Sequence, residues 1–200
     1  MRINKKCNIE YVIIVILSIM CMLLVIQNYR LKYNEISATK MIDIIKTGER
    51  LPIIKYVNTS DEMDSLTFLD TGYSCYILAV FRSECGGCNM AWPIWADLKH
   101  SAPPNTRFIG FTTENTESID SLTHKIAPPF DIGIVLNPER FQERFGIVGV
   151  PTTIIVGSGG IFHSAWTGPI DNKGKKMVLK AIEECDTIAW SEVKEIPRDN

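Results

Sequence analysis

The sequence contains no long run of charge of one sign. Its 200 residues include 21 lysines and arginines and 23 aspartates and glutamates, which gives a formal net charge of -2. Nucleic acids and other polyanions are bound through clustered basic side chains, so this charge pattern argues against a nucleic-acid partner. Internal repeats and low-complexity tracts are absent as well. With 46% hydrophobic residues, the chain is expected to form one globular domain and a short additional segment.

Metal-ligating residues are also few. The three histidines, His100, His124 and His163, are scattered along the chain, which has no H-x-x-x-H pair and a single C-x-x-C motif. A zinc site needs four protein ligands, or three and a water. We therefore expect no metal and no other cofactor. A zinc half-site and a purely structural disulfide stay as alternative interpretations of the C-x-x-C motif.

The first 30 residues differ from the rest of the chain. Three basic residues within the first six precede residues 11–26, a run without charge. As a helix this run is about 24 Å long, somewhat short of a hydrocarbon core of about 30 Å, so flanking residues are expected to extend it. The pattern predicts a single-pass transmembrane helix over residues 9–29. A cleaved signal peptide is the alternative, but residues 27–30 (QNYR) are not the small residues that a cleavage site needs.

This layout divides the chain into five parts. They are a cytoplasmic tail (1–8), a transmembrane anchor (9–29), a juxtamembrane spacer (30–50), a globular domain (51–186) and a polar C-terminal tail (187–200). The basic residues on the two sides of the anchor are equal in number and do not set its orientation. A short basic tail before one apolar segment and a long soluble domain is typical of an exported protein. The domain is therefore predicted on the extracytoplasmic, periplasmic side of the inner membrane.

Within the domain, short apolar runs alternate with helical patterns. Apolar runs bounded by turn formers indicate strands, and longer segments with apolar residues three or four apart indicate helices. We predict strands at 53–57, 67–69, 76–81, 107–112, 132–136, 152–156 and 161–167, and helices at 88–100, 116–125, 138–145 and 175–185. Strand and helix units that alternate and end in a hairpin and a helix predict an α/β fold with a mixed sheet.

The sequence S-E-C-G-G-C at residues 83–88 lies where an apolar strand is followed by a helix. Cys85 therefore falls at the helix N-terminus, where unpaired backbone N–H groups and the helix dipole stabilise a thiolate and lower its pKa below the free value of about 8.5. Cys88 lies close to the first sulfur and is less exposed. The pattern predicts a redox-active disulfide in which Cys85 is the nucleophile and Cys88 the resolving residue.

Two motifs resemble those of the thioredoxin-like superfamily. Residues 85–93 (CGGCNMAWP) resemble its active-site helix, and residues 145–152 (FGIVGVPT) resemble the loop that carries a cis-proline facing the two sulfurs. Gly168 matches a family glycine. The resemblance covers about residues 51–186. It implies a thioredoxin-like fold, with a mixed central sheet flanked by helices.

A long stretch between residues 111 and 145 and additional strands before residue 76 resemble the membrane-anchored TlpA and ResA type. This resemblance implies a thiol-disulfide oxidoreductase that reduces disulfides of exported client proteins, for example in cytochrome c maturation, with electrons from a membrane donor. The Gly-Gly dipeptide between the cysteines does not set the redox direction. A disulfide oxidase or isomerase of the same fold stays an alternative, as does a non-enzymatic, membrane-tethered module that binds a metal or a partner through its thiols.

Val150 and Pro151 are the predicted substrate-binding residues. A cis bond between them would turn the start of the following strand so that Val150 exposes its backbone N–H and C=O groups. An extended client segment could pair with this backbone and bring its disulfide over Cys85.

The sequence departs from the family pattern at two acids. Where thioredoxins usually have a buried acid this chain has Ala79, and where TlpA and ResA proteins usually have a glutamate it has Ala91. Such a carboxylate accepts the proton of the resolving thiol. Either Glu84 or water does this here, or the redox pair is tuned differently. Glu84 and Arg82 are otherwise expected to be surface charges.

Two further pairs have a plain structural interpretation. Trp92 and Trp95 are expected to pack against the sheet rather than to flank a client groove. Cys75 and Cys185 are expected to be buried thiols, with a second disulfide between them as the alternative.

Overall fold

The chain divides into two compact units, Met1–Ala38 and Thr39–Asn200. The computed structural model describes residues 5–37, 40–41, 45–69 and 72–185. The predicted C-terminal tail, residues 187–200, therefore lies outside the described residues.

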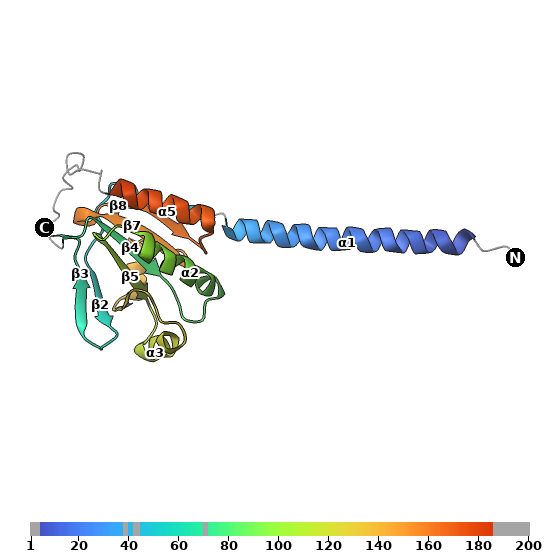
Figure 1. Ribbon diagram of the computed structural model, residues 1–200. Coiled ribbons are helices and arrows are strands. Elements are labelled where there is room, and N and C mark those ends of the chain that lie inside the picture. Colours follow the sequence, from blue (N-terminus) through green and yellow to red (C-terminus); the bar gives the residue numbers. More distant parts are fainter. Residues whose placement is uncertain (1–4, 38–39, 42–44, 70–71, 186–200) are drawn as a thin grey trace. The chain divides into compact units, whose positions relative to one another are not determined.

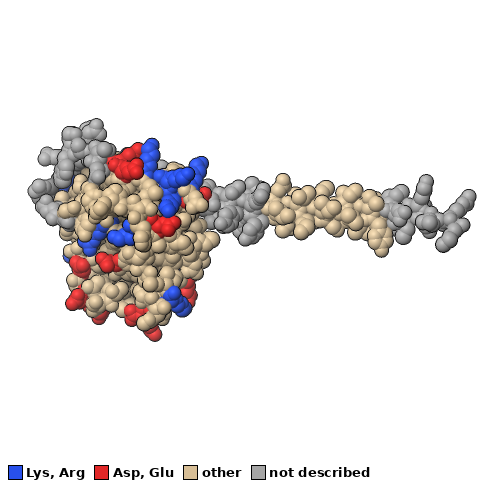
Figure 2. Space-filling view, viewed as in Figure 1, with Lys and Arg blue, Asp and Glu red and all other residues tan. Residues whose placement is uncertain are grey.

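The first unit is one long helix, α1 (Lys5–Ser37). Its large apolar side chains between residues 11 and 26 are all 47–69% exposed. Figure 2 shows this stretch without charged side chains. Within the described parts of the chain, no helix combines the length and the apolar character needed to cross a membrane. The transmembrane helix predicted over residues 9–29 was thus not found.

The second unit is built on an eight-stranded sheet with the order β1-β8-β7-β4-β5-β6-β2-β3. β4, β5 and β6 are parallel neighbours, and the other pairs are antiparallel, as the prediction of a mixed sheet requires. The strands are β1 (Lys40–Met41), β2 (Ile54–Asn58), β3 (Met63–Leu66), β4 (Cys75–Val80), β5 (Thr106–Thr112), β6 (Asp131–Val135), β7 (Thr152–Gly157) and β8 (Phe162–Thr167).

Helices cover both faces of the sheet. They are α2 (Gly86–Ser101), α3 (Thr116–Lys125), α4 (Pro138–Arg144) and α5 (Asn172–Cys185), with a 3-10 turn, η1 (Ser158–Gly160), between β7 and β8. Figure 1 shows α2 and α5 side by side over the sheet. Asparagine side chains begin two of the helices: Asn115 caps α3 and Asn137 caps α4, each accepting a backbone N–H at 3.0 Å.

The central strand β4 separates two hydrophobic cores. Because side chains alternate along a strand, Ile77 and Ala79 face the core formed with α2, α3 and α5, whereas Leu78 and Val80 face the core that includes Phe141 of α4. Every residue of β4 is at most 2% exposed. A strand buried on both faces is continuously apolar, which is why residues 76–81 were predicted so clearly. Both cores lie within residues 45–185, so the second unit carries its own hydrophobic core.

Most predicted strands and helices are confirmed to within a few residues, but one strand is wrong. The chain pairs over Met63–Leu66 instead of residues 67–69. The ladder with β2 ends at the pair Ile54 and Leu66. Pro52 lies two residues before Ile54, just ahead of β2. A proline has no N–H to donate, so the β2–β3 ladder does not continue in that direction. Phe68 is buried because it packs in the core, and not because it lies in a strand.

Part of the predicted spacer, residues 30–50, belongs to the domain. Ile45 is 7% exposed and packs in the core beside α4. The Gly48 N–H donates to the Phe162 carbonyl at 2.8 Å, and Arg50 forms an isolated bridge with Ile161. The segment before β2 is therefore bound to the β7–β8 hairpin and not extended away from the fold. The polar side chains of this segment gave no indication of the pairing, because the pairing uses backbone N–H and C=O groups.

Cys75 and Cys185 are 1% and 2% exposed and are not joined by a disulfide. They lie close to each other all the same: Cys75 is the register partner of Gly157, and a Cβ at Gly157 would lie 3.7 Å from the Cys185 Sγ. The prediction of buried thiols is confirmed.

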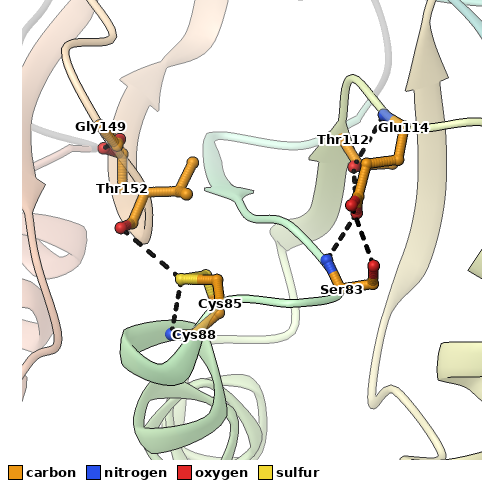
Figure 3. Close-up of a disulfide and its surroundings, with 8 residues drawn as sticks. Ser83, Cys85, Cys88, Thr112, Glu114, Gly149 and Thr152 are labelled. Atoms are coloured by element: carbon orange, nitrogen blue, oxygen red, sulfur yellow. Dashed lines mark hydrogen bonds between the residues drawn. A yellow bond between two sulfur atoms is a disulfide. The ribbon is translucent and has the colours of Figure 1, made fainter. Parts of the chain in front are cut away.

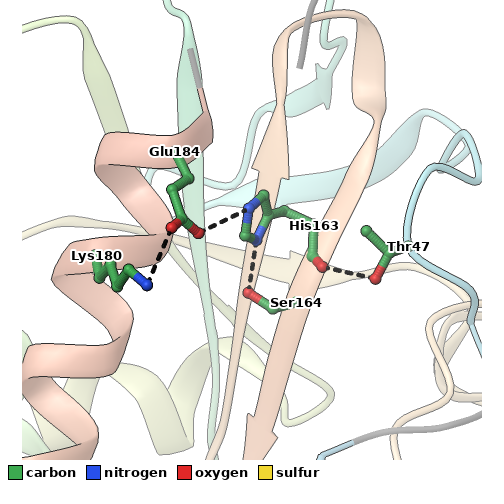
Figure 4. Close-up of polar contacts among 5 residues, drawn as sticks. All are labelled: Thr47, His163, Ser164, Lys180 and Glu184. Carbon is green, nitrogen blue, oxygen red and sulfur yellow. Dashed lines mark hydrogen bonds and ion pairs between the residues drawn. The ribbon is translucent and has the colours of Figure 1, made fainter. Parts of the chain in front are cut away.

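His163 links β8 to α5 and to the segment before β2 (Figure 4). Its Nδ1 lies 3.0 Å from the Ser164 hydroxyl, its Nε2 lies 3.9 Å from the Glu184 carboxylate, and its carbonyl accepts from the Thr47 hydroxyl. Burial lowers the pKa of His163 below 6.5, against the smaller opposing effect of Glu184. The fold therefore favours the neutral imidazole.

This environment predicts a pH-dependent contribution to stability. A histidine whose pKa is lower in the folded than in the unfolded state adds to the free energy of unfolding. This stabilisation is complete above about pH 6.5 and is lost as the pH falls through the folded-state pKa. The free energy of unfolding of residues 39–200, measured by urea titration, should fall between pH 7.5 and pH 5.5. His163→Gln should show a smaller fall. Equal losses in the parent and the variant would show that His163 does not cause the pH dependence.

Candidate active site

Cys85 lies at the junction of a buried strand and an exposed helix start. β4 ends at Val80, and α2 begins at Gly86 with Cys85 as its N-cap residue in an extended conformation. The Cys85 sulfur accepts the backbone N–H of Cys88 at 3.1 Å. Serine, threonine, aspartate and asparagine usually fill this position, because the first N–H groups of a helix have no partner within it. Here a sulfur takes that role.

Cys85 and Cys88 are joined by a disulfide, with 5.1 Å between their Cα atoms. Their exposure is unequal: Cys85 is partly exposed, whereas Cys88 is 0% exposed and packs in the core between the sheet and α2. A reaction partner in solvent can therefore reach the sulfur of Cys85 but not that of Cys88.

The peptide bond between Val150 and Pro151 is cis, as predicted. It brings the Val150 carbonyl oxygen to 3.7 Å from the Cys85 sulfur. Val150 is partly exposed, whereas Pro151 is buried. The structure thus brings together all four predicted site residues, Cys85, Cys88, Val150 and Pro151.

Two hydrogen bonds hold the loop that contains Pro151. The Thr152 hydroxyl donates to the Gly149 carbonyl at 2.7 Å, and the Gly168 N–H donates to the Pro151 carbonyl at 2.7 Å. Gly168 has a φ of 101°, which an L side chain rarely adopts, so glycine is required for this second bond. The family glycine that the sequence suggested therefore has a local physical reason.

Gly87 lets the active-site helix approach this loop. A Cβ at residue 87 would lie 3.1 Å from the Pro151 Cδ and 3.9 Å from the Cys85 sulfur. That first distance is tighter than ordinary van der Waals contact, so a larger residue would push the helix and the loop apart. A Cβ at Gly86 would meet nothing within 4 Å, so only the second glycine is explained by packing.

The two tryptophans of α2 anchor the helix to the sheet. Trp95 is 0% exposed, and its indole N–H donates to the Thr153 hydroxyl of β7 at 2.9 Å. Trp92 is 5% exposed and stacks on Phe130, with 5.6 Å between the ring centroids. Both tryptophans pack as predicted. The Trp95 bond also ties α2 to the strand that follows Pro151.

Ala79 and Ala91 occupy buried positions in the same core as Cys88, and both are at most 1% exposed. Carboxylates at these positions would be buried in the same core as the inner sulfur, so the departure from the family pattern changes the core that contains Cys88. Glu84 and Arg82 are exposed, and neither forms an ion pair within the described residues. Both are surface charges.

Glu114 was not identified from the sequence, although it contacts the loop that carries Cys85 (Figure 3). Its carboxylate accepts the backbone N–H and the hydroxyl of Ser83, the latter at 2.9 Å. The Thr112 hydroxyl, at 3.4 Å, is a further neighbour. The available signal was its position directly after β5: parallel neighbouring strands end at the same edge of a sheet, so the loop after β5 meets the loop after β4.

Comparison with known proteins gives no match to a family model and none among curated proteins. Solved structures do match. The thioredoxin domain of a thiol-disulfide oxidoreductase from Bacteroides vulgatus is 16% identical, with a TM-score of 0.59 over 69% of this chain and 99% of that one. StoA from Bacillus subtilis is 13% identical, with a TM-score of 0.52 over 65% and 96%.

A peroxiredoxin-like protein from Aquifex aeolicus is 9% identical, with a TM-score of 0.57 over 74% of this chain and 92% of that one. The match thus covers these neighbours almost entirely, and about two thirds to three quarters of this chain. At such low identity the likeness concerns the fold alone. The second unit has a thioredoxin-like fold, with a mixed sheet flanked by helices.

Proposed function

We propose that the chain is a thiol-disulfide oxidoreductase that reduces disulfides of exported client proteins. The observation that carries this proposal is the position of Cys85: its sulfur caps a helix N-terminus, receives the Cys88 N–H at 3.1 Å and faces the Val150 carbonyl at 3.7 Å. Backbone N–H groups and the helix dipole stabilise negative charge on that sulfur. The sulfur is therefore suited to act as a nucleophile beside a backbone segment that a client could pair with.

The reaction follows from the unequal exposure of the two sulfurs. In the reduced protein the Cys85 thiolate attacks one sulfur of a client disulfide, forming a mixed disulfide and releasing the other client sulfur as a thiolate. The Cys88 thiolate then attacks the Cys85 sulfur and releases the second client thiolate. Two electrons pass to the client, and the Cys85–Cys88 disulfide forms. A membrane electron donor would restore the reduced pair.

Client recognition uses the backbone more than particular side chains in this proposal. Val150 lies in the loop two residues before β7 and is partly exposed, so an extended client segment can pair with its backbone groups. Such pairing suits a protein that acts on several exported clients, cytochrome c precursors among them. A disulfide oxidase is the second candidate. Stabilising the Cys85 thiolate stabilises the reduced form of the pair, and this makes the Cys85–Cys88 disulfide a stronger oxidant.

We also propose that α1 tethers the domain to the inner membrane, with the domain on the extracytoplasmic side. The exposed apolar side chains of residues 11–26 support this, because a contiguous apolar surface of that kind is unfavourable in water. An oxidising compartment would suit a disulfide-exchange site.

The tether predicts a difference between the full chain and residues 39–200. The full chain should sediment with membranes, resist extraction by carbonate and be released by detergent, whereas residues 39–200 should stay in the supernatant. A full chain that is monomeric in the supernatant would contradict the tether but leave the exchange chemistry untouched.

The roles assigned to Cys85 and Cys88 predict that only one of the two single-cysteine variants traps a mixed disulfide with a client protein. Reduced Cys88→Ala should form a stable mixed disulfide with proteins whose disulfides are intact, because the buried thiol that resolves the adduct is missing. Cys85→Ala should form none, since its remaining sulfur is inaccessible. Non-reducing gels and mass spectrometry measure the adduct and identify the cysteine. If both variants trapped equal amounts of mixed disulfide, Cys85 would not be the attacking residue. If Cys88→Ala trapped no client that contains a disulfide, the disulfide oxidase would be the better assignment.

Glu114 is proposed as a positioning residue, and this predicts a kinetic effect. Glu114→Ala removes the acceptor that holds Ser83, so the Cys85 sulfur should lose part of its alignment with the Cys88 N–H. A thiol pKa higher by up to about one unit would lower the exchange rate near pH 7 by up to about tenfold. The pH at which the exchange rate reaches half of its maximum should therefore be higher in Glu114→Ala than in the parent.

Glu117→Ala, an exposed acid in the first turn of α3, is the matched control and should leave the rate and its midpoint unchanged. If Glu114→Ala lowers the melting temperature without moving the midpoint, then Glu114 has only a structural role.

A further inference from the structure

A cavity of about 280 Å³ lies outside the active site. It is found where β6 ends, β2 begins and α4 runs across them, and none of the residues that line it belongs to the disulfide site. β6 runs parallel to β5, as β5 does to β4, so the cavity lies at the same edge of the sheet as the loop carrying Cys85. Ligands of α/β proteins commonly bind at the carboxyl ends of parallel strands.

The cavity has an apolar interior and an apolar rim. Phe141 and Phe145 of the α4 segment are 5% and 3% exposed, and their ring centroids lie 4.7 Å apart. Ile53 and Leu136 also line the cavity, yet they are 58% and 46% exposed. Large apolar side chains around a concavity are typical of a ligand site rather than of ordinary surface.

All charged residues that line the cavity are basic. They are Lys55, Arg140 and Arg144, and none of them forms an ion pair within the described part of the chain. The acids of α4, Glu139 and Glu143, do not line the cavity. The site therefore combines an apolar interior with an uncompensated positive charge.

The remaining polar residue of the lining is a donor as well. The Asn137 side-chain oxygen accepts the Arg140 backbone N–H at 3.0 Å as the cap of α4. Its amide NH₂ group adds two N–H donors that can bind a ligand. Guanidinium groups bind carboxylates with paired, charge-assisted hydrogen bonds. The donors at this site thus fit an anion and would repel a cation.

We propose that this cavity binds a small amphipathic carboxylate, an alkyl chain with one carboxylate head. A water occupies about 30 Å³ in the liquid, so 280 Å³ offers room for roughly nine or ten non-hydrogen atoms. Octanoate has that size. Its chain covers the exposed faces of Ile53 and Leu136 and contacts the two phenylalanines, while its head group lies against Arg140 and Arg144. The site is independent of the redox reaction.

The proposal is tested on residues 39–200, which carry their own hydrophobic core, by titrating the ¹⁵N-labelled domain with octanoate and following amide shifts by NMR. The expected result is saturable shifts confined to the segments around Ile53, Leu136 and α4. Octylammonium, which has the same chain and the opposite charge, should give none. Arg140→Gln and Arg144→Gln should each weaken octanoate binding at least fivefold.

Lys173→Gln is the matched control, because Lys173 is an exposed cation on α5 that does not line the cavity. It should bind octanoate like the parent. Arg144→Glu, at an exposed position where misfolding is not expected, should abolish octanoate binding while the rest of the spectrum is retained. The proposal is overturned if octanoate gives no saturable shifts up to about 10 mM, if octylammonium binds equally well, or if the shifts spread over the whole domain.

Discussion

The approach of helix α2 to the cis-proline loop is the contact on which the site depends. Gly87 has no side chain, so its backbone can approach the Pro151 ring, and this brings the Cys85 sulfur to 3.7 Å from the Val150 carbonyl. Cys85 is partly exposed beside this contact, whereas Cys88 is buried in the core between the sheet and α2. The close approach thus sets which backbone a partner of Cys85 would meet, and the core sets which of the two sulfurs that partner can reach.

The contact is held from both sides by polar bonds and by the core. On the helix side, Trp95 fills the space above the sheet and donates to Thr153. On the loop side, Gly168 and Thr152 fix the carbonyls around the proline. A net contribution of about 1 kcal/mol for each neutral hydrogen bond is modest, so packing of the buried helix face supplies most of the stability and the bonds set the geometry.

Local features of the site could be predicted from the sequence because they depend on neighbouring residues. The C-x-x-C motif follows an apolar run and precedes a helical pattern, which is sufficient to place Cys85 at a helix start. Val150 and Pro151 were recognised from the residues on either side of them. Glu114 and the true position of β3 depend on which strands become neighbours in the sheet. The pairing of Gly48 and Arg50 likewise depends on the β7–β8 hairpin, so the sequence around them gave no signal.

The N-terminal residues and the buried alanines differ from the sequence-based expectation and from the family pattern, respectively. No helix of the described residues has the length and apolar character to cross a membrane, so the helix predicted over residues 9–29 was not found, although the apolar side chains of α1 at residues 11–26 are exposed. Ala79 and Ala91 place no carboxylate in the core that contains the inner sulfur, so in the proposed mechanism the helix N-terminus and the loop held by Glu114 activate the site. The chemistry therefore depends on how strongly α2 stabilises charge on Cys85.

The most direct test of this account is the rate at which the reduced domain is alkylated by iodoacetamide as a function of pH, with the modified residue identified by mass spectrometry. The account predicts that Cys85 reacts first and that the midpoint of its rate lies well below the value of about 8.5 for a free thiol, while Cys88 reacts slowly. A midpoint near 8.5, or equal modification of both cysteines, would contradict it.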